Sequence, residues 1–145
     1  MELYLVQHGG ARDEKEDPQR RLTQKGKEET EKVAKLLNVK CDIIMHSGKA
    51  RARETAEIFA KYLNAKISEE KGLAPLDDVI PWVERLNKEE RNIMIVGHLP
   101  FLQKLLSVLI QSEEVVKFRY SGCLKLKKEK EKFLVEWFVT PDSIK

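Results

Sequence analysis

Two histidines and one arginine stand close behind short apolar runs, and these residue types can hold and transfer a phosphoryl group. His8 comes after the run LYLV, His98 after IMIV, and Arg51 after IIM. An imidazole can act as a nucleophile or proton carrier, and a guanidinium fork binds the oxygens of a tetrahedral anion. The sequence therefore predicts a site for a phosphate-like anion, provided that folding brings the three side chains together.

The apolar runs predict the strands that must carry these residues. Leu3 to Val6, Ile43 to Met45 and Ile93 to Val96 are almost continuously apolar, which is typical of strands buried on both faces of a parallel sheet. Between and after them, apolar or small residues recur at helical spacing. The three predicted helical faces comprise Gly26, Thr30, Val33, Ala34 and Leu37, then Ala52, Thr55, Ala56, Phe59 and Leu63, and then Leu102, Leu105, Leu106 and Leu109.

The remaining elements complete an α/β pattern. A further helix is predicted over Asp78 to Leu86, with Pro81 tolerated in its first turn. Near the end the period becomes two, in CLKLK and FLVEWF, which predicts an antiparallel hairpin at the sheet edge. Strand and helix alternate along 145 residues, so we expect one three-layer α/β domain over residues 1–145. Its mostly parallel central sheet should carry helices on both faces and the hairpin at one side.

The predicted topology brings the chemical residues together. In an open parallel sheet the carboxyl ends of the strands line one crevice, where ligands bind. The segments after the three runs should therefore meet, and a helix starting near Lys49 adds free N–H groups that favour an anion. Gly9 and Gly10 would let the backbone approach a ligand closely. Phosphate is the expected ligand.

Alternative readings of the histidines concern metal and structure. A lone histidine at a strand end is usually structural, but two at equivalent strand ends with an arginine at a third favour a site. His46 closes the second run, so a three-histidine metal site is conceivable. No carboxylate or cysteine keeps ligand-like spacing with these histidines, so we predict no metal and, for His46, either a structural role or a role in supporting the site residues.

Composition restricts the other partners. The net charge is +3 although 35% of residues are charged, which argues against nucleic acid. The basic stretch KLKKEKEK is interrupted by glutamates and is predicted to be a solvated turn. Cys41 and Cys123 have no Cys-x-x-Cys spacing, so free thiols in a reducing compartment are expected. With no apolar leader and no span of bilayer length, we expect a cytoplasmic protein without membrane contact.

Four motifs in order resemble the histidine phosphatase superfamily, and within it the SixA-like phosphohistidine phosphatases. They are QHGGA at 7–11, RLTQKG at 21–26, SGKARARET at 47–55 and VGHLP at 96–100. The resemblance implies a phosphoglycerate mutase-like fold and a covalent phosphohistidine mechanism. The resemblance also implies that His8 is the nucleophile, that Arg51 binds the phosphoryl oxygens, and that His98 stabilises the charge that develops in transfer.

The resemblance also implies the partners. Water would release inorganic phosphate from the phosphorylated His8, and no metal or organic cofactor is required. The substrate would be a phosphohistidine protein, because the short loops leave the site open to a protein surface. A phosphatase for small phosphate esters is less favoured, since the chain lacks the insertion that would form a substrate lid.

The chain departs from the family pattern at Gln7, which stands where the family has the arginine of Arg-His-Gly. An amide is a neutral and shorter donor than a guanidinium, so a phosphate contact at Gln7 would be weaker. Arg12, Arg20 and Arg21 lie near the loop after His8 and could compensate, with Arg21 preferred from its place before Leu-Thr. The predicted phosphate contacts are therefore Gln7, Gly9, Arg51, His98 and Arg21.

Two questions stay open at this level. The proton donor for the leaving group has three candidates, Glu70, Asp77 and Asp78, each equally compatible with a solvated surface position. The function also has an alternative, because Gln7 would suit a non-catalytic module that binds phosphate or phosphoproteins without turning them over.

The second departure from the family pattern, Ser47-Gly48 in place of Ser-Pro, is minor because glycine adopts the same backbone shape.

Overall fold

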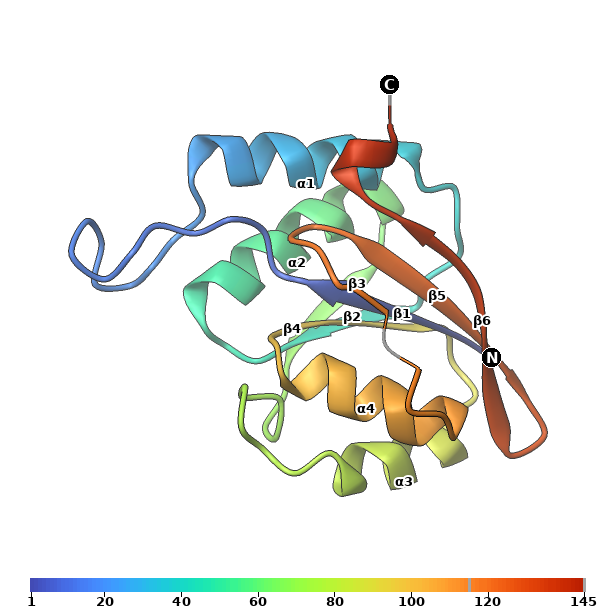
Figure 1. The fold of residues 1–145 in the computed structure, drawn as a ribbon. Helices are drawn as coiled ribbons and strands as arrows, with labels where there is room; N and C mark the ends of the chain where they lie inside the picture. The colour runs from blue at the N-terminus through green and yellow to red at the C-terminus, as the bar shows by residue number, and fades with distance from the viewer. Residues whose placement is uncertain (115, 145) are drawn as a thin grey trace.

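The computed structural model describes residues 1–114 and 116–144, and its centre is a six-stranded sheet covered by helices on both faces (Figure 1). The strand order is β3-β2-β4-β1-β5-β6, with β1 to β4 parallel and β5 and β6 antiparallel. The strands are β1 (Glu2–Gln7), β2 (Ile43–His46), β3 (Lys66–Glu69), β4 (Ile93–Gly97), β5 (Cys123–Glu129) and β6 (Lys132–Val139). The helices are α1 (Gln24–Leu36), α2 (Ala50–Leu63), α3 (Ile80–Lys88), α4 (Phe101–Ile110) and the 3-10 turn η1 (Pro141–Ser143).

This architecture confirms the predicted fold class, with differences at two elements. The sequence predicts no strand at the position of β3, because β3 is short and mostly exposed and carries no apolar run. α3 begins at Ile80 rather than Asp78 and continues to Lys88, with Pro81 in its first turn. Asp78 instead accepts a hydrogen bond from the N–H of Ile80 at 3.0 Å, so it precedes the helix.

Alternate residues of β1 pack into two apolar layers, one on each face of the sheet. Leu3 and Leu5 pack with α3 and α4, whereas Tyr4 and Val6 pack with α1 and α2. Figure 1 shows the two helix pairs on opposite faces of the sheet. Within the described ranges, no helix has both the length and the apolarity to cross a lipid bilayer.

The C-terminal hairpin is present as predicted, but most of the basic stretch, which was expected to be a solvated turn, belongs to strand β5, and only residues 130–131 form the turn. β5 pairs with both β1 and β6, so β6 lies at the sheet edge. Lys125 lies between the carboxylates of Glu2 and Glu136 at 3.0 and 3.1 Å. Part of the positive charge of this stretch is therefore paired with carboxylates of the protein itself.

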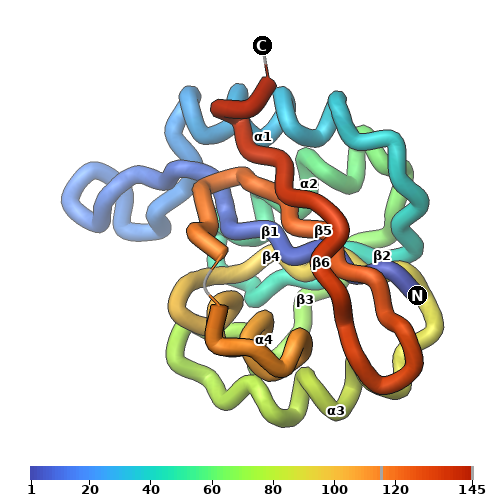
Figure 2. Tube along the Cα trace, turned by 45° about the vertical axis from the view of Figure 1, so that its right-hand side comes forward, coloured from blue at the N-terminus to red at the C-terminus, as the bar shows by residue number. Residues whose placement is uncertain are grey.

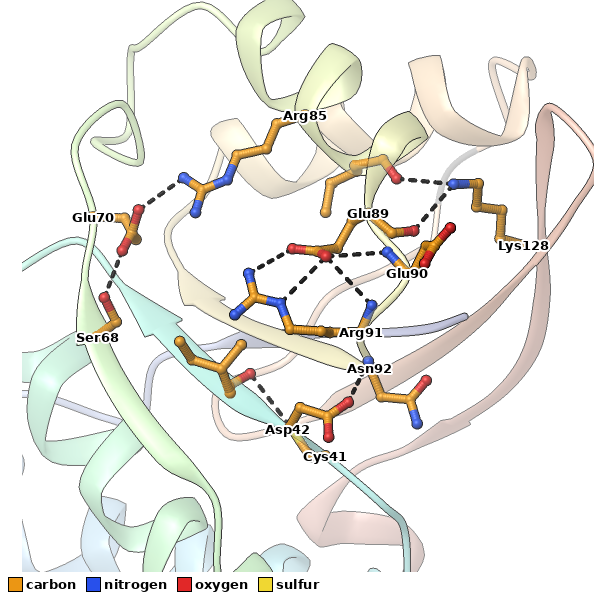
Figure 3. A network of polar contacts seen from close by, with 12 residues as sticks. Cys41, Asp42, Ser68, Glu70, Arg85, Glu89, Glu90, Arg91, Asn92 and Lys128 are labelled. Atoms are coloured by element: carbon orange, nitrogen blue, oxygen red, sulfur yellow. Dashed lines mark hydrogen bonds and ion pairs between the residues drawn. The ribbon is translucent and has the colours of Figure 1, made fainter.

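A polar network fixes the amino ends of β2 and β4 (Figure 3). The N–H of Asn92 donates to the carboxylate of Asp42 at 2.7 Å, and the N–H of Asp42 donates to the Asn92 carbonyl at 2.9 Å. Lys128 donates to the Glu89 carbonyl at 3.2 Å, near the end of α3. These contacts fix the register of β2 and β4 at their amino ends, which lie opposite to their carboxyl ends.

The polar loop after β1 extends away from the body of the protein, as both ribbon and tube views show (Figures 1 and 2). Its return to α1 requires close approach of two backbones, because a Cβ on Gly26 would overlap the carbonyl of Gly10. Thr23 caps α1 by accepting the N–H of Gly26 at 2.9 Å. The start of α1 is thereby held against the segment that follows His8.

Substituting Gly26→Ala tests this close approach. Alanine favours a helix, yet here the added methyl must displace the Gly10 backbone, so we expect a loss of about 1–3 kcal/mol in the free energy of unfolding. The control is Gly10→Ala, whose Cβ meets nothing closer than 3.8 Å and should change stability by less than about 0.5 kcal/mol. Urea denaturation measures both, and a Gly26→Ala protein as stable as the native chain would contradict the packing argument.

Candidate active site

His8 and His98 lie side by side because they follow neighbouring parallel strands. Gln7 at the end of β1 is opposite Gly97 at the end of β4, and the N–H of His8 donates to the Gly97 carbonyl at 3.1 Å. The two imidazole centroids are 5.1 Å apart and the rings are tilted by 51°. The structure thus brings together the two histidines that the sequence placed at equivalent strand ends.

The hydrogen bond of His8 fixes its tautomer. Nδ1 lies 2.8 Å from the Gly9 carbonyl oxygen, which can only accept, so Nδ1 carries the proton and donates it. The pKa of His8 is lowered to about 4, mainly by burial and to a smaller extent by the charge of Arg51, while the Gly9 bond acts in the opposite direction. At neutral pH the ring is therefore uncharged and Nε2 has a free lone pair.

His98 is more deeply buried, with 1% of its surface exposed. Its Nε2 lies 2.7 Å from the hydroxyl oxygen of Ser47, which follows β2. Burial is again the main cause that lowers its pKa, to about 3, and the neighbouring His8 and Arg51 add to it. The sequence indicates Ser47 only as part of the SGKARARET motif, because its contact with His98 depends on β4 lying next to β2.

Arg51 is positioned by the first turn of α2 and by Thr55. The Thr55 hydroxyl donates to the Arg51 carbonyl at 2.7 Å and accepts the N–H of Gly9 at 2.9 Å. This single side chain ties the residue after His8 to the turn that carries Arg51. Burial lowers the pKa of Arg51, and a second guanidinium, that of Arg20, lowers it further.

Three polar atoms at predicted site residues are buried without a hydrogen-bond partner among residues 1–114 and 116–144. They are Nε of Arg51, Nδ1 of His98 and Oε1 of Gln7. An unsatisfied buried polar group costs about 1–3 kcal/mol, and such groups in a native fold need an explanation. A bound oxyanion would supply acceptors for the Arg51 donor, which fits the predicted ligand.

The structure gives Gly9 a packing role in addition to the predicted one. A Cβ there would lie 2.8 Å from the Thr30 hydroxyl and 3.1 Å from that of Ser121. The N–H of Gly9 already donates to the Thr55 hydroxyl. Glycine at this position is therefore explained by contact with α1 and the segment before β5, and phosphate binding by Gly9 stays a prediction.

Arg20, rather than Arg21, is the loop arginine that acts electrostatically on both histidines. Arg21 forms an ion pair with Asp17 at 2.8 Å and leaves 52% of its side chain exposed. Arg20 adopts φ 51°, and its charge is among the causes that lower the pKa of both His8 and His98. The buried Asp17 carboxylate also accepts the N–H groups of Gln19 and Arg21, which holds the turn around Arg20. The sequence marked both arginines but preferred Arg21.

Tyr120 is a neighbour of His8 that the sequence did not indicate. Its ring centroid lies 5.4 Å from that of His8 with a tilt of 35°, and 45% of the residue is exposed. The residue precedes β5 and is paired with Gln7. No motif or periodicity marks it, because its position depends on how the chain enters β5.

The other sequence candidates have local structural partners. His46 accepts the N–H of Gly48 at 3.0 Å, in keeping with the predicted structural role. Glu70 pairs with Arg85 at 2.7 Å, and Asp77 accepts the N–H of Ala74 at 2.8 Å. In the part of the chain that the structure describes, no three His, Cys, Asp or Glu residues form a group able to hold a metal ion.

Comparison with known families decides the relationship. Residues 3–78 match the model of the histidine phosphatase superfamily, branch 1. The chain belongs to this superfamily. The match includes His8 and Arg51, whereas His98 lies beyond it. No curated protein matches the sequence.

Solved structures of several phosphatases share the fold across nearly the whole chain. The protein histidine phosphatase SixA, solved with tungstate, has a TM-score of 0.86 and 24% identity over 98% of both chains. The alpha-ribazole phosphatase of Shigella flexneri has a TM-score of 0.80 and 16% identity over 97% of both chains. A mycobacterial glucosyl-3-phosphoglycerate phosphatase, solved with VO3, has a TM-score of 0.75 and 12% identity over 94% of this chain and 97% of its own.

The low pKa values of the two histidines predict a pH-dependent stability. The unfolded chain binds a proton on each imidazole near pH 6.5, whereas the folded chain does so only near pH 4 for His8 and 3 for His98. Between these limits the unfolded state binds more protons, so stability falls as the pH is lowered. Each imidazole contributes up to about 1.4 kcal/mol per pH unit.

The test is urea denaturation at pH 6.5 and 4.5. The native chain should lose more stability over this interval than His98→Gln, which lacks one of the titrating groups. Equal losses in the two proteins would show that His98 is not held neutral by the fold.

Proposed function

We propose that the protein is a phosphohistidine phosphatase that works through a phosphorylated His8. One observation carries the proposal: the Nδ1 proton of His8 is donated to the Gly9 carbonyl, which leaves Nε2 unprotonated beside His98. A neutral imidazole held in one tautomer is a ready nucleophile at neutral pH. The substrate is a protein phosphorylated on histidine, and inorganic phosphate is the product.

The first step transfers the phosphoryl group. Nε2 of His8 forms a bond to phosphorus as the phosphorus–nitrogen bond of the substrate breaks. The departing electron pair stays on the substrate imidazole, which leaves neutral because its other nitrogen was already protonated. This leaving group needs no separate acid, consistent with the local partners of Glu70 and Asp77.

The second step regenerates the enzyme. A water oxygen forms a bond to phosphorus, the bond to Nε2 of His8 breaks, and one water proton leaves with the phosphate or the solvent. Arg51 and Arg20 supply the positive charge that attracts the equatorial oxygens in both steps. The oxyanions tungstate and VO3 in the two phosphatases of the same fold support an anion site of this kind. Neither step requires a metal or an organic cofactor.

Arg20 takes over part of the role of the family arginine that Gln7 replaces. Its guanidinium is a cation that acts on both histidines, whereas the Gln7 amide is neutral. We therefore assign phosphate binding at this loop to Arg20 in place of Arg21. The side chain of Gln7 is buried, and its amide contributes at most an uncharged contact.

The function is tested by phosphate release from a protein phosphorylated on histidine with phosphoramidate. The native chain should release phosphate, His8→Ala should release none, and Gln7→Arg should gain less than about threefold, since another guanidinium already acts there. Acid-labile phosphate on the native chain, but not on His8→Ala, would identify the intermediate. A native chain that releases no phosphate, when a SixA protein does so under the same conditions, would refute the proposal.

Replacing Arg20 tests its assignment separately. Arg20→Ala should lower kcat/KM for the phosphohistidine protein by about a hundredfold, because a charged transition-state donor is lost. Arg53→Ala removes the same charge from the exposed side of α2, where Arg53 pairs with Glu57 at 3.7 Å, and serves as the control. Similar losses in both variants would mean that net charge, rather than a contact made by Arg20, sets the rate.

A phosphate-binding module is the second candidate, and the neutral Gln7 favours it. A module would bind inorganic phosphate or a phosphohistidine protein in calorimetric titration without forming an acid-labile phosphoenzyme. If only Gln7→Arg releases phosphate, the chain has the scaffold of a phosphatase but uses it for binding.

A further inference from the structure

Tyr120 is the aromatic side chain that contacts the ring of His8. The two ring centroids are 5.4 Å apart, close to the 5.1 Å that separates His8 from His98. Unlike the two histidines, Tyr120 is an exposed residue, at 45%, so it can be reached by a molecule that approaches His8.

The residues on both sides of Tyr120 are tightly held. Arg119 pairs with Glu29 at 2.8 Å and with Asp142 at 2.7 Å. On the other side, the N–H of Ser121 donates to the Gln7 carbonyl at 2.9 Å. The backbone on each side of the tyrosine is therefore fixed, and one of these contacts is made to the residue before His8.

The backbone at Ser121 carries strain that these contacts support. Ser121 is buried and has φ 63°, which a residue with a side chain rarely adopts. Its hydroxyl lies 2.7 Å from that of Thr30, whose own proton is donated to the Gly26 carbonyl, so Ser121 is the donor. Strained residues that the surroundings hold in place are frequent at ligand sites. Here the strained residue directly follows Tyr120, whose ring lies beside that of His8.

We propose that Tyr120 is a specificity-determining residue whose ring stacks on a planar leaving group during phosphoryl transfer to His8. This inference rests on the proposed function and adds to it a selection for phosphorus bound to an aromatic nitrogen. An imidazole leaving group is flat and has a π face that can stack on the phenol ring. Ammonia or an alkyl alcohol has no such face and would gain nothing from the contact.

Two small substrates with the same phosphorus–nitrogen bond isolate this contact. Phosphoimidazole has a ring leaving group, and phosphoramidate releases ammonia. The quantity measured is the ratio of kcat/KM for phosphoimidazole to kcat/KM for phosphoramidate. Differences in intrinsic reactivity cancel when the same ratio is compared among variants.

Tyr120→Leu should lower this ratio roughly three- to tenfold, as expected for loss of one aromatic contact. Tyr120→Phe should keep the native ratio, because the ring and not the hydroxyl makes the contact. Phe118→Leu is the matched control in the same segment: Phe118 packs on Phe138 at 6.4 Å and should leave the ratio unchanged. Thermal midpoints of all variants separate loss of contact from loss of fold.

Each further outcome has one meaning. If Tyr120→Leu slows both substrates equally, the residue positions His8 and does not select the leaving group, and the inference fails while the proposed function stands. If Tyr120→Phe lowers the ratio as much as Tyr120→Leu, the ring contact is excluded. If the native chain turns over neither substrate, nor a phosphohistidine protein, both the proposed function and this inference fail.

Discussion

The geometry of the candidate site depends on one hydroxyl group, that of Thr55. It accepts the N–H of Gly9 and donates to the carbonyl of Arg51, so it joins the segment after β1 to the first turn of α2. β1 and β2 are not neighbours in the sheet, and the strand register alone does not place Arg51 relative to His8. A short, buried, two-way hydrogen bond does this with little freedom of rotation.

The electrostatics of the site follow from burial more than from paired charges. His8 and His98 are kept neutral mainly by desolvation, while nearby guanidinium groups disfavour a second positive charge. Neutral imidazoles and permanent cations therefore coexist at the same crevice. This division suits a reaction in which the nitrogen must attack and the guanidinium groups must attract oxygen anions.

Much of this arrangement could be predicted from the sequence. The apolar runs of β1, β2 and β4 and the helical faces of α1, α2 and α4 are strong periodic signals, and they place His8, Arg51 and His98 beyond the carboxyl ends of these strands. β3 carries no such signal because it is an exposed edge strand. The choice between Arg20 and Arg21 depends on Asp17, whose buried carboxylate pairs with Arg21 across a turn. Tyr120 depends on a strained loop, and no local pattern encodes such a tertiary contact.

The strand order has a consequence for when the site forms during synthesis. β4 lies between β1 and β2, although it follows both in the chain. A nascent chain that has emerged only as far as α3 holds His8 and Arg51, but lacks the strand that separates and buries them. Long-range parallel pairing of this kind forms late in folding. Until β4 inserts, His8 has neither the Gly97 carbonyl that accepts its N–H nor the ring of His98 beside it, so an incomplete chain lacks an assembled site.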